Sequence, residues 1–391
     1  MAEKPQLIGE GTYGCVARPS LTCQDSPSMD YTHKVSKLMT KKHAQREVHD
    51  YETVLNIPGI EEFLIPKPHI CKPNDNSAFR EFFSHCSISK LKKPDAELRL
   101  LILEDGGVAL DDVFMLLPNM SEEDFKLFLC SWGKIIDAVC FLATHKIMHH
   151  DLKLGNIVYN VQTGDLKFID FGKVKSMKEF ISSSSTNRNL EGSAWFNYPE
   201  ENKCTNKEDF QGKEECAVFR DDMAYNEFIQ KAALTFDMYS IGLVFKELVE
   251  FMVKFKDLVK NTRHFEDIPI KFFEDCYFLG EKMSDPDLKH REFTPCKFKD
   301  SFAKICETHK LKCSGPNKLS AALVKNLENV EHVISMDKLV KTEEQCRKKK
   351  KRLNPYTNKC VKRCAKGFVR KKKPKTQTRK NGLFKCVRKR T

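Results

Sequence analysis

The sequence predicts an α+β protein made of two parts with opposite net charge. Residues 31–39 and the apolar run at 98–105 are typical of strands, while residues 41–55 and 121–142 are typical of helices. The chain has 67 basic and 54 acidic residues, a net charge of +13, but residues 341–391 alone hold 22 basic and two acidic residues. This basic tail therefore carries +20, and the first 340 residues carry −7, with ample length for a large core.

A glycine-rich stretch near the N-terminus is the first candidate binding element. Residues 8–16 read I-G-E-G-T-Y-G-C-V, which has the spacing G-x-G-x-x-G-x-V. Glycines let backbone amides approach an anion without a side chain between them, although the pattern alone also fits a surface hairpin. The predicted phosphate-binding residues are Ile8, Gly9, Glu10, Gly11, Thr12, Tyr13, Gly14, Cys15 and Val16.

The second candidate element places two carboxylates, a lysine and an amide close together in the sequence. Residues 149–156 read H-H-D-L-K-L-G-N, and D-F-G follows at 170–172. Phosphoryl transfer needs this set, because one carboxylate deprotonates an acceptor hydroxyl while an amide and a second carboxylate hold metal ions that bridge ATP phosphates. We predict Asp151, Lys153, Asn156 and Asp170 as catalytic residues, with Asn156 and Asp170 as metal ligands.

In order and spacing, residues 7–250 resemble the eukaryotic-type Ser/Thr protein kinases. G-S-A-W-F-N-Y-P-E at 192–200 and D-M-Y-S-I-G at 237–242 resemble two further motifs of that family. The resemblance implies a bilobal protein-kinase fold, with a β-rich N-lobe at about 1–105 and a helical C-lobe at about 106–340. It also implies ATP and Mg²⁺ as cofactors and protein substrates with Ser/Thr acceptors, the latter indicated by Lys153 two residues after Asp151.

The resemblance further implies a lysine that contacts the ATP phosphates and a helical glutamate that holds it. Lys34 and Lys37 are both candidates, and we favour Lys37 because Val35 shares its face of the strand. Glu47 is the favoured partner in the 41–55 helix, with Glu52 as the alternative. Leu103 would then border the adenine site, and backbone groups of the hinge from Glu104 to Gly106 would bind adenine.

Two features depart from the family pattern. His150 replaces the arginine that normally receives an activation-segment phosphate, and a mostly neutral histidine is a poor phosphate ligand. Residues 201–230 are charged and irregular in sequence, which predicts a surface insertion.

The basic tail contains an internal echo, K-C-V-K-R at 359–363 and K-C-V-R-K at 385–389. It resembles the small basic, cysteine-containing adaptor modules fused to kinases of nucleocytoplasmic large DNA viruses of the iridovirus-like kind. We expect a polyanion such as nucleic acid, or an acidic protein, as its partner. A solubility tail and a nuclear-import signal are the alternatives. The resemblance implies the host cytoplasm and the virion as locations.

Twelve of the 16 cysteines are scattered through the first 340 residues without close spacing, and the sequence has no secretion signal or long apolar span. We therefore expect reduced, intracellular cysteines and no membrane span. The four tail cysteines lack the paired spacing of a zinc site. A scaffold without catalysis is a weaker hypothesis, since no catalytic residue is missing. A protein that acts mainly through its tail remains an alternative function.

Overall fold

A computed structural model describes residues 4–11, 13–113, 116–117, 120–184, 198–258 and 268–313, together with four short tail segments at 351–354, 359–362, 368–372 and 384–388. The chain divides into two compact units, Met1–Val324 and Lys325–Thr391. The boundary predicted at residue 340 falls outside the described residues.

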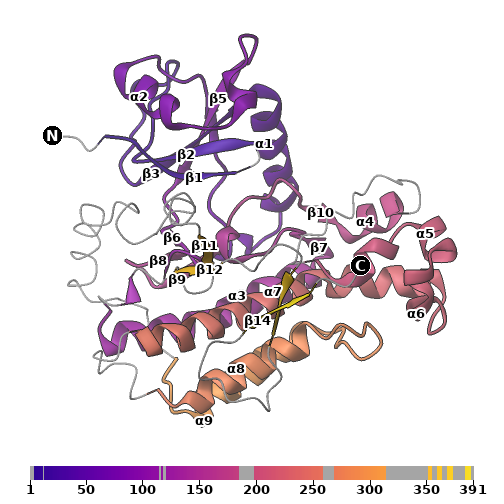
Figure 1. Cartoon of the computed structure of the whole chain (residues 1–391). Helices are drawn as coiled ribbons and strands as arrows, with labels where there is room; N and C mark the ends of the chain where they lie inside the picture. The colour runs from indigo at the N-terminus through magenta and orange to yellow at the C-terminus, as the bar shows by residue number, and fades with distance from the viewer. Residues whose placement is uncertain are drawn as a thin grey trace. The chain divides into compact units, whose positions relative to one another are not determined.

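The N-terminal lobe of the first unit is built on a five-stranded sheet with the order β1-β2-β3-β5-β4 (Figure 1). All neighbouring strands are antiparallel. In this register Lys37 lies opposite Val16 on one side and Leu101 on the other. The strands are β1 (Gln6–Glu10), β2 (Gly14–Arg18), β3 (Lys34–Thr40), β4 (His69–Cys71) and β5 (Leu98–Glu104).

Two helices cover opposite faces of this sheet, as Figure 1 shows. Helix α1 (Lys41–Leu55) has the predicted bounds and packs Ala44 against a small cluster from β3 and β5. Helix α2 (Ser77–His85) was not predicted, and it buries Phe79 and Phe82 in the larger cluster on the other face. The Asn76 side chain caps α2 by accepting a hydrogen bond from the Phe79 amide at 2.9 Å.

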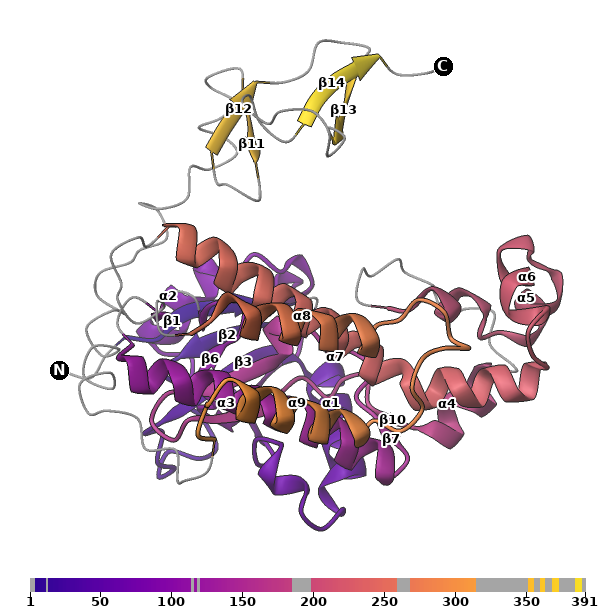
Figure 2. The same cartoon turned by 90° about the horizontal axis from the view of Figure 1, so that it is seen from below.

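The C-terminal lobe is mainly helical, and Figure 2 shows α3, α7, α8 and α9 packed side by side. Its central helix, α3, begins at the predicted cap, where Ser121 and Asp124 form a capping box. The helices are α3 (Glu122–Thr144), α4 (Met177–Ser184), α5 (Lys207–Gly212), α6 (Ala217–Arg220), α7 (Tyr225–Leu258), α8 (Ile270–Met283) and α9 (Lys297–Thr308).

Within the described residues, α3 is the one helix with the length and apolar composition of a membrane span. Its apolar side chains are largely buried inside the lobe, where Trp132 packs edge-on against Phe128 and against Phe245 of α7. This burial is typical of the core helix of a globular domain.

Short strands position residues 149–156, the predicted catalytic loop (called the catalytic loop below). A three-stranded sheet has the order β6-β8-β9, and a two-stranded sheet pairs β7 with β10. The loop at 149–156 therefore runs from β7 into β8 and ends in a 3₁₀ turn at Leu154–Asn156. The strands are β6 (Val108–Ala109), β7 (Ile147–Met148), β8 (Ile157–Asn160), β9 (Asp165–Phe168) and β10 (Lys175–Ser176).

Residues 201–230, which we predicted to be a surface insertion, form short helices, including α5 and α6. Phe210 and Phe219 of these helices pack into the same core cluster as Phe228 of α7. Glu201 also forms a fully buried ion pair with Arg291.

The described residues of the second unit form two antiparallel hairpins, β11 (Lys351–Asn354) with β12 (Lys359–Lys362) and β13 (Phe368–Lys372) with β14 (Phe384–Arg388). The two copies of the echoed sequence fall mainly on β12 and β14, the second strand of each hairpin. Cys360 and Cys386 each lie on the second strand of their hairpin.

Candidate active site

The ammonium group of Lys37 is held between two carboxylates. Its Nζ donates hydrogen bonds to both oxygens of Glu47, at 2.9 and 2.8 Å, and lies 3.6 Å from Oδ1 of Asp170. Burial acts to lower the pKa of Lys37, but the two carboxylates outweigh it and hold that pKa above its ordinary value. Lys37 is therefore a fixed cation at the junction of β3, α1 and the Asp170 turn.

The competing residues have other partners. Lys34 lies opposite Glu104 in the sheet, and its Nζ is 2.5 Å from the Glu104 carboxylate. Glu52, the alternative to Glu47, instead accepts a hydrogen bond from Lys67 at 2.5 Å. Of the two lysines, the structure brings Lys37 to a helical glutamate and places Lys34 at the start of β3, opposite the end of β5.

The Asp151 carboxylate lies close to three side-chain nitrogen atoms. Lys173 Nζ donates to Oδ1 at 3.0 Å, while Asn156 Nδ2 lies 3.3 Å and Lys153 Nζ 3.6 Å from Oδ2. Asn156 Nδ2 also donates to the Asp151 carbonyl at 2.7 Å, which closes the loop on itself. Asp151, Lys153 and Asn156 are thus brought together, and Lys173 is a further contact of Asp151 that we did not predict.

Asp237 binds the backbone of the catalytic loop. Its two carboxylate oxygens accept hydrogen bonds from the amides of His149, at 2.6 Å, and His150, at 2.9 Å. Burial raises the pKa of Asp237 to about 6, although the two amides act to lower it. The loop conformation includes a positive φ of 64° at His150, which this bidentate contact supports.

The catalytic loop is joined to the segment that carries Asp170. The Ile169 amide donates to the Asn156 carbonyl at 3.0 Å, and His149 Nε2 lies 3.1 Å from the Ile169 carbonyl. The buried Phe171 ring then lies 4.9 Å from the ring of Tyr51 on α1 and 4.8 Å from that of His149. Helix α1, the Asp170 turn and the catalytic loop therefore pack directly against one another.

Asp170 itself remains available to a ligand. Its side chain is 42% exposed, and its backbone has a positive φ of 62°. Burial of the carboxylate acts to raise the pKa of Asp170, but Lys37, His149 and Lys153 hold it below its ordinary value. Asp170 is therefore ionised at neutral pH, and with the Asn156 amide it offers the hard oxygen ligands that Mg²⁺ prefers.

The glycine-rich hairpin of β1 and β2 has one crowded glycine and two open ones. A Cβ on Gly14 would lie 2.7 Å from the Leu38 carbonyl, so only glycine permits this approach to β3. No heavy atom lies within 4 Å of a Cβ built on Gly9, and one atom, at 4.0 Å, is near Gly11. Ile8 and Tyr13 expose their side chains, Glu10 is exposed, Cys15 is buried, Val16 is half-buried, and Thr12 lies outside the described residues.

The hinge between the lobes is fixed by Arg18. Its Nη2 donates to Oδ1 of Asp105 and to the Gly107 carbonyl, both at 2.6 Å. A Cβ on Gly106 would lie 2.6 Å from side-chain carbons of Ile65 and Val158, so the backbone passes through a narrow gap. Hydrogen bonds from Arg18 thus fix the predicted hinge. No recognisable signal in the sequence indicated this role of Arg18.

The open glycines, the Lys37 cation and the two oxygen ligands together fit a polyphosphate with a divalent cation. Residues 81–211 match the model of the family described as the protein kinase domain, a span that includes Asp151, Asn156 and Asp170. The chain carries a protein kinase domain.

Two curated proteins are similar to parts of this domain. The serine/threonine-protein kinase SSN3 of Candida albicans is 26% identical over 160 residues, which cover 38% of this chain and 24% of that protein. The serine/threonine-protein kinase pim-2 of Danio rerio is 36% identical over 100 residues, which cover 26% of this chain and 31% of that protein. The chain thus spans about a quarter to a third of the length of the curated relatives it matches.

His150 of the kinase domain lies in an aromatic cluster. Its ring stacks on Phe236 with the centroids 4.4 Å apart and lies 5.4 Å from Tyr198 and 5.6 Å from Phe180. Burial holds the pKa of His150 well below its ordinary value. The Tyr198 hydroxyl donates to the His150 carbonyl at 3.0 Å and accepts from Lys173 Nζ at 3.3 Å. Packing and this hydrogen bond therefore join Tyr198 to the catalytic loop. The motif at 192–197 lies outside the described residues.

The prediction that the cysteines of the first 340 residues are reduced is wrong for ten of them. Five disulfide bonds join cysteines that mostly lie far apart in the sequence. Only Cys276 and Cys306, both buried, are free among the described residues. The bonds are Cys15–Cys86, Cys23–Cys71, Cys130–Cys313, Cys140–Cys296 and Cys204–Cys216.

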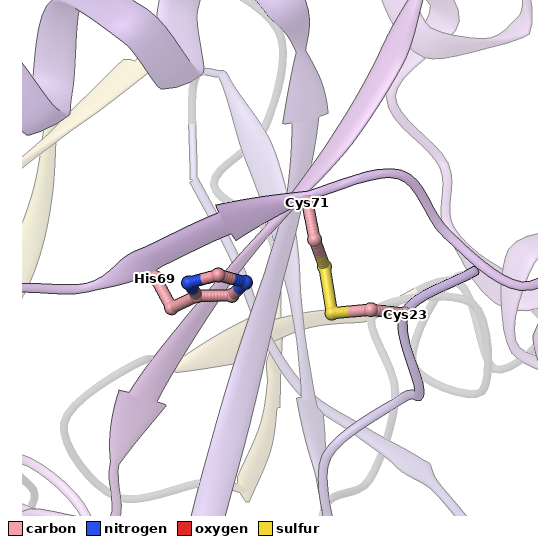
Figure 3. Close-up of side chains that lie close together, drawn as sticks. All are labelled: Cys23, His69 and Cys71. Carbon is pink, nitrogen blue, oxygen red and sulfur yellow. A yellow bond between two sulfur atoms is a disulfide. The ribbon is translucent and has the colours of Figure 1, made fainter. Parts of the chain in front are cut away.

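Two groups of side chains in the N-terminal lobe lie close enough together to suggest metal sites. Figure 3 shows the first, in which the His69 ring lies beside the bond between Cys23 and Cys71. The second consists of Glu10 with the bonded Cys15 and Cys86. Because both sulfur atoms of each group are bonded to one another, neither group offers the thiolates that a zinc site requires.

Proposed function

We propose that the protein transfers the γ-phosphoryl group of ATP to Ser or Thr hydroxyls of protein substrates. The observation that carries the proposal is that two sets of side chains converge where α1, the Asp170 turn and the catalytic loop pack together. One set is Asp151 with Lys153 and Asn156, and the other is Lys37 with Glu47 and Asp170.

Each residue has a role that its contacts support. Asp151 would accept the proton of the attacking hydroxyl, and Lys153 beside it would offset negative charge on the transferred group. Lys37, oriented by Glu47, would bind phosphate oxygens below the glycine-rich hairpin. Asn156 and Asp170 would hold Mg²⁺, which would neutralise charge on the phosphates. The hinge backbone at Glu104–Gly106 would bind adenine.

The experiment is phosphotransfer from labelled ATP with magnesium to basic and Ser-rich acceptors, measured with the purified full chain. Asp151→Asn removes the base and Asp170→Asn removes a metal ligand, so each should reduce transfer by about 10³-fold or more. Thermal denaturation of both variants should match the parent protein. Near-parental transfer by Asp170→Asn contradicts this mechanism.

A second function is supported by the tail. We propose that residues 341–391 attach the kinase domain to a polyanion or to an acidic protein. With +20 in 51 residues, the tail has the charge to displace counterions from phosphates. The catalytic part, at −7, would be repelled by such a partner. Three aromatic residues, Tyr356, Phe368 and Phe384, leave little capacity for base stacking.

Binding of the full chain to DNA and RNA at rising salt, with a chain lacking residues 341–391 as the control, tests this attachment. Affinity should fall steeply with salt in the full chain and be absent in the control. No binding at low salt contradicts attachment to nucleic acid and leaves an acidic protein as the partner.

Resemblance of the tail to viral adaptor modules supports an origin in a large DNA virus. The five disulfide bonds support the virion, rather than the reducing host cytoplasm, as the place where the protein persists. Detection of the protein, with these bonds intact, in purified virions would test this placement.

A further inference from the structure

The segment between β4 and β5 reaches the glycine-rich hairpin. Residues 72–97 include α2 and the 3₁₀ turn Ser89–Lys92, and they cover the face of the sheet opposite α1. Phe79 and Phe82 anchor this segment in the same buried cluster as Cys15 and Ala17 of β2. The segment is therefore a fixed support rather than a loose surface loop.

Three contacts join the end of this segment to the hairpin. Cys86 forms a disulfide bond with Cys15, and both residues are fully buried. The backbone amide and hydroxyl of Ser87 donate to the Glu10 carboxylate at 2.5 and 2.6 Å. Lys90 Nζ lies 5.3 Å from the centre of the Tyr13 ring. The contacts fall on the last residue of β1, the turn and the second residue of β2.

This arrangement constrains a part of the site that is otherwise easily deformed. The hairpin contains three glycines within six residues, and glycine has the largest conformational freedom to lose when a ligand orders the chain. The space around Gly9 and Gly11 is open, so this is the side of the hairpin on which phosphates would lie. A hairpin already fixed from its other side loses less entropy on binding, and preorganisation of this kind raises affinity.

We propose that Cys86 and Ser87 are positioning residues that hold the glycine-rich hairpin in place for ATP, acting through Cys15 and Glu10. The proposal rests on the function proposed above, because it takes ATP as the ligand under the hairpin. It adds a role for a segment that contains none of the predicted site residues.

The test compares Cys86→Ala and Ser87→Ala with a matched control, the double variant Cys204→Ala/Cys216→Ala. The control also loses one disulfide bond, but from the segment that packs on α7. For each protein, the KM for ATP and kcat are measured with one acceptor, and the Kd for Mg-ATP is measured by equilibrium binding.

We expect Cys86→Ala to raise the KM and Kd for ATP about tenfold and Ser87→Ala to raise them about threefold, with kcat little changed. The control should leave both constants within about twofold of the parent. Unchanged ATP affinity in Cys86→Ala, or an equal loss in the control, overturns the proposal. If Cys86→Ala does not fold, Ser87→Ala decides alone, since it leaves the disulfide intact. A parent protein that binds ATP but transfers no phosphate refutes the proposed reaction, while the Kd comparison still judges the positioning role.

Discussion

Lys37 and Lys34 lie three residues apart on β3, yet the structure gives them different surroundings. Lys37 meets Glu47 and Asp170, whereas Lys34 meets Glu104. The sequence left both lysines open because a single strand does not reveal which face meets a helix. The contact with α1, which forms only in the folded chain, distinguishes Lys37 from Lys34.

Lys37→Met should reduce phosphotransfer by about 10²-fold or more, because it removes a fixed cation from the phosphate site and leaves Glu47 buried without its partner. Lys34→Met should retain most activity, since only a partly exposed ion pair with Glu104 is lost. Steady-state rates of both variants at saturating acceptor provide the measurement. The reverse ranking would identify Lys34 as the ATP lysine.

His150 should make the protein less stable in acid. Its Nε2 is buried and has no hydrogen-bond partner among the described residues, and burial keeps its pKa well below the ordinary value. Below about pH 6.5 the unfolded chain therefore binds a proton that folded His150 does not, so stability falls as the pH decreases. Between about pH 7.5 and 5.5, the parent should lose roughly 1 kcal/mol more than His150→Phe in denaturant unfolding. Equal losses would mean that folded His150 accepts the proton.

At the scale of elements, the glycine-rich hairpin separates structural from ligand-facing glycines. Gly14→Ala would force a Cβ to 2.7 Å from the Leu38 carbonyl, and overpacking of this kind costs about 1–3 kcal/mol. Gly9→Ala meets no atom within 4 Å and should leave the free energy of unfolding nearly unchanged. Thermal denaturation of the two variants without nucleotide would show the difference. A larger loss for Gly9→Ala would contradict this placement of the hairpin.

Elements with strong local signals were predicted from the sequence, and elements stabilised by distant contacts were not. Helix α1 has the predicted bounds, and α3 begins at the predicted Ser121 cap. Helix α2 and the helices within 201–230 were missed because they are short, and their stability comes from buried phenylalanines rather than from a long periodic pattern. Lys173 and Tyr198 meet Asp151 and the catalytic loop only after the chain folds.

At the scale of the whole molecule, the disulfide bonds are the largest departure from the sequence prediction. Four of the five join cysteines that lie 48 to 183 residues apart, so spacing could not reveal them. In an entropic description, each such bond would stabilise the fold by about 4 kcal/mol, mainly by restricting the unfolded chain.

Alkylation without reductant should label two of the twelve cysteines in residues 1–313, Cys276 and Cys306, and only after denaturation. Burial raises the pKa of the Cys306 thiol to about 11 and that of Cys276 well above its ordinary range, so reaction in the folded protein should be slow. Peptide mass spectrometry would detect five linked pairs. Labelling of Cys15 or Cys86 would contradict the bond beneath the hairpin.

The bonds Cys130–Cys313 and Cys140–Cys296 also determine how far the chain can be shortened. The kinase motifs end near residue 250, but the central helix α3 finds its covalent partners at 296 and 313. A recombinant fragment that ended soon after the motifs would carry two orphaned thiols on the helix that leads into the catalytic loop. Such thiols exchange readily and would link one molecule to another. A monomeric catalytic fragment therefore has to extend past Cys313.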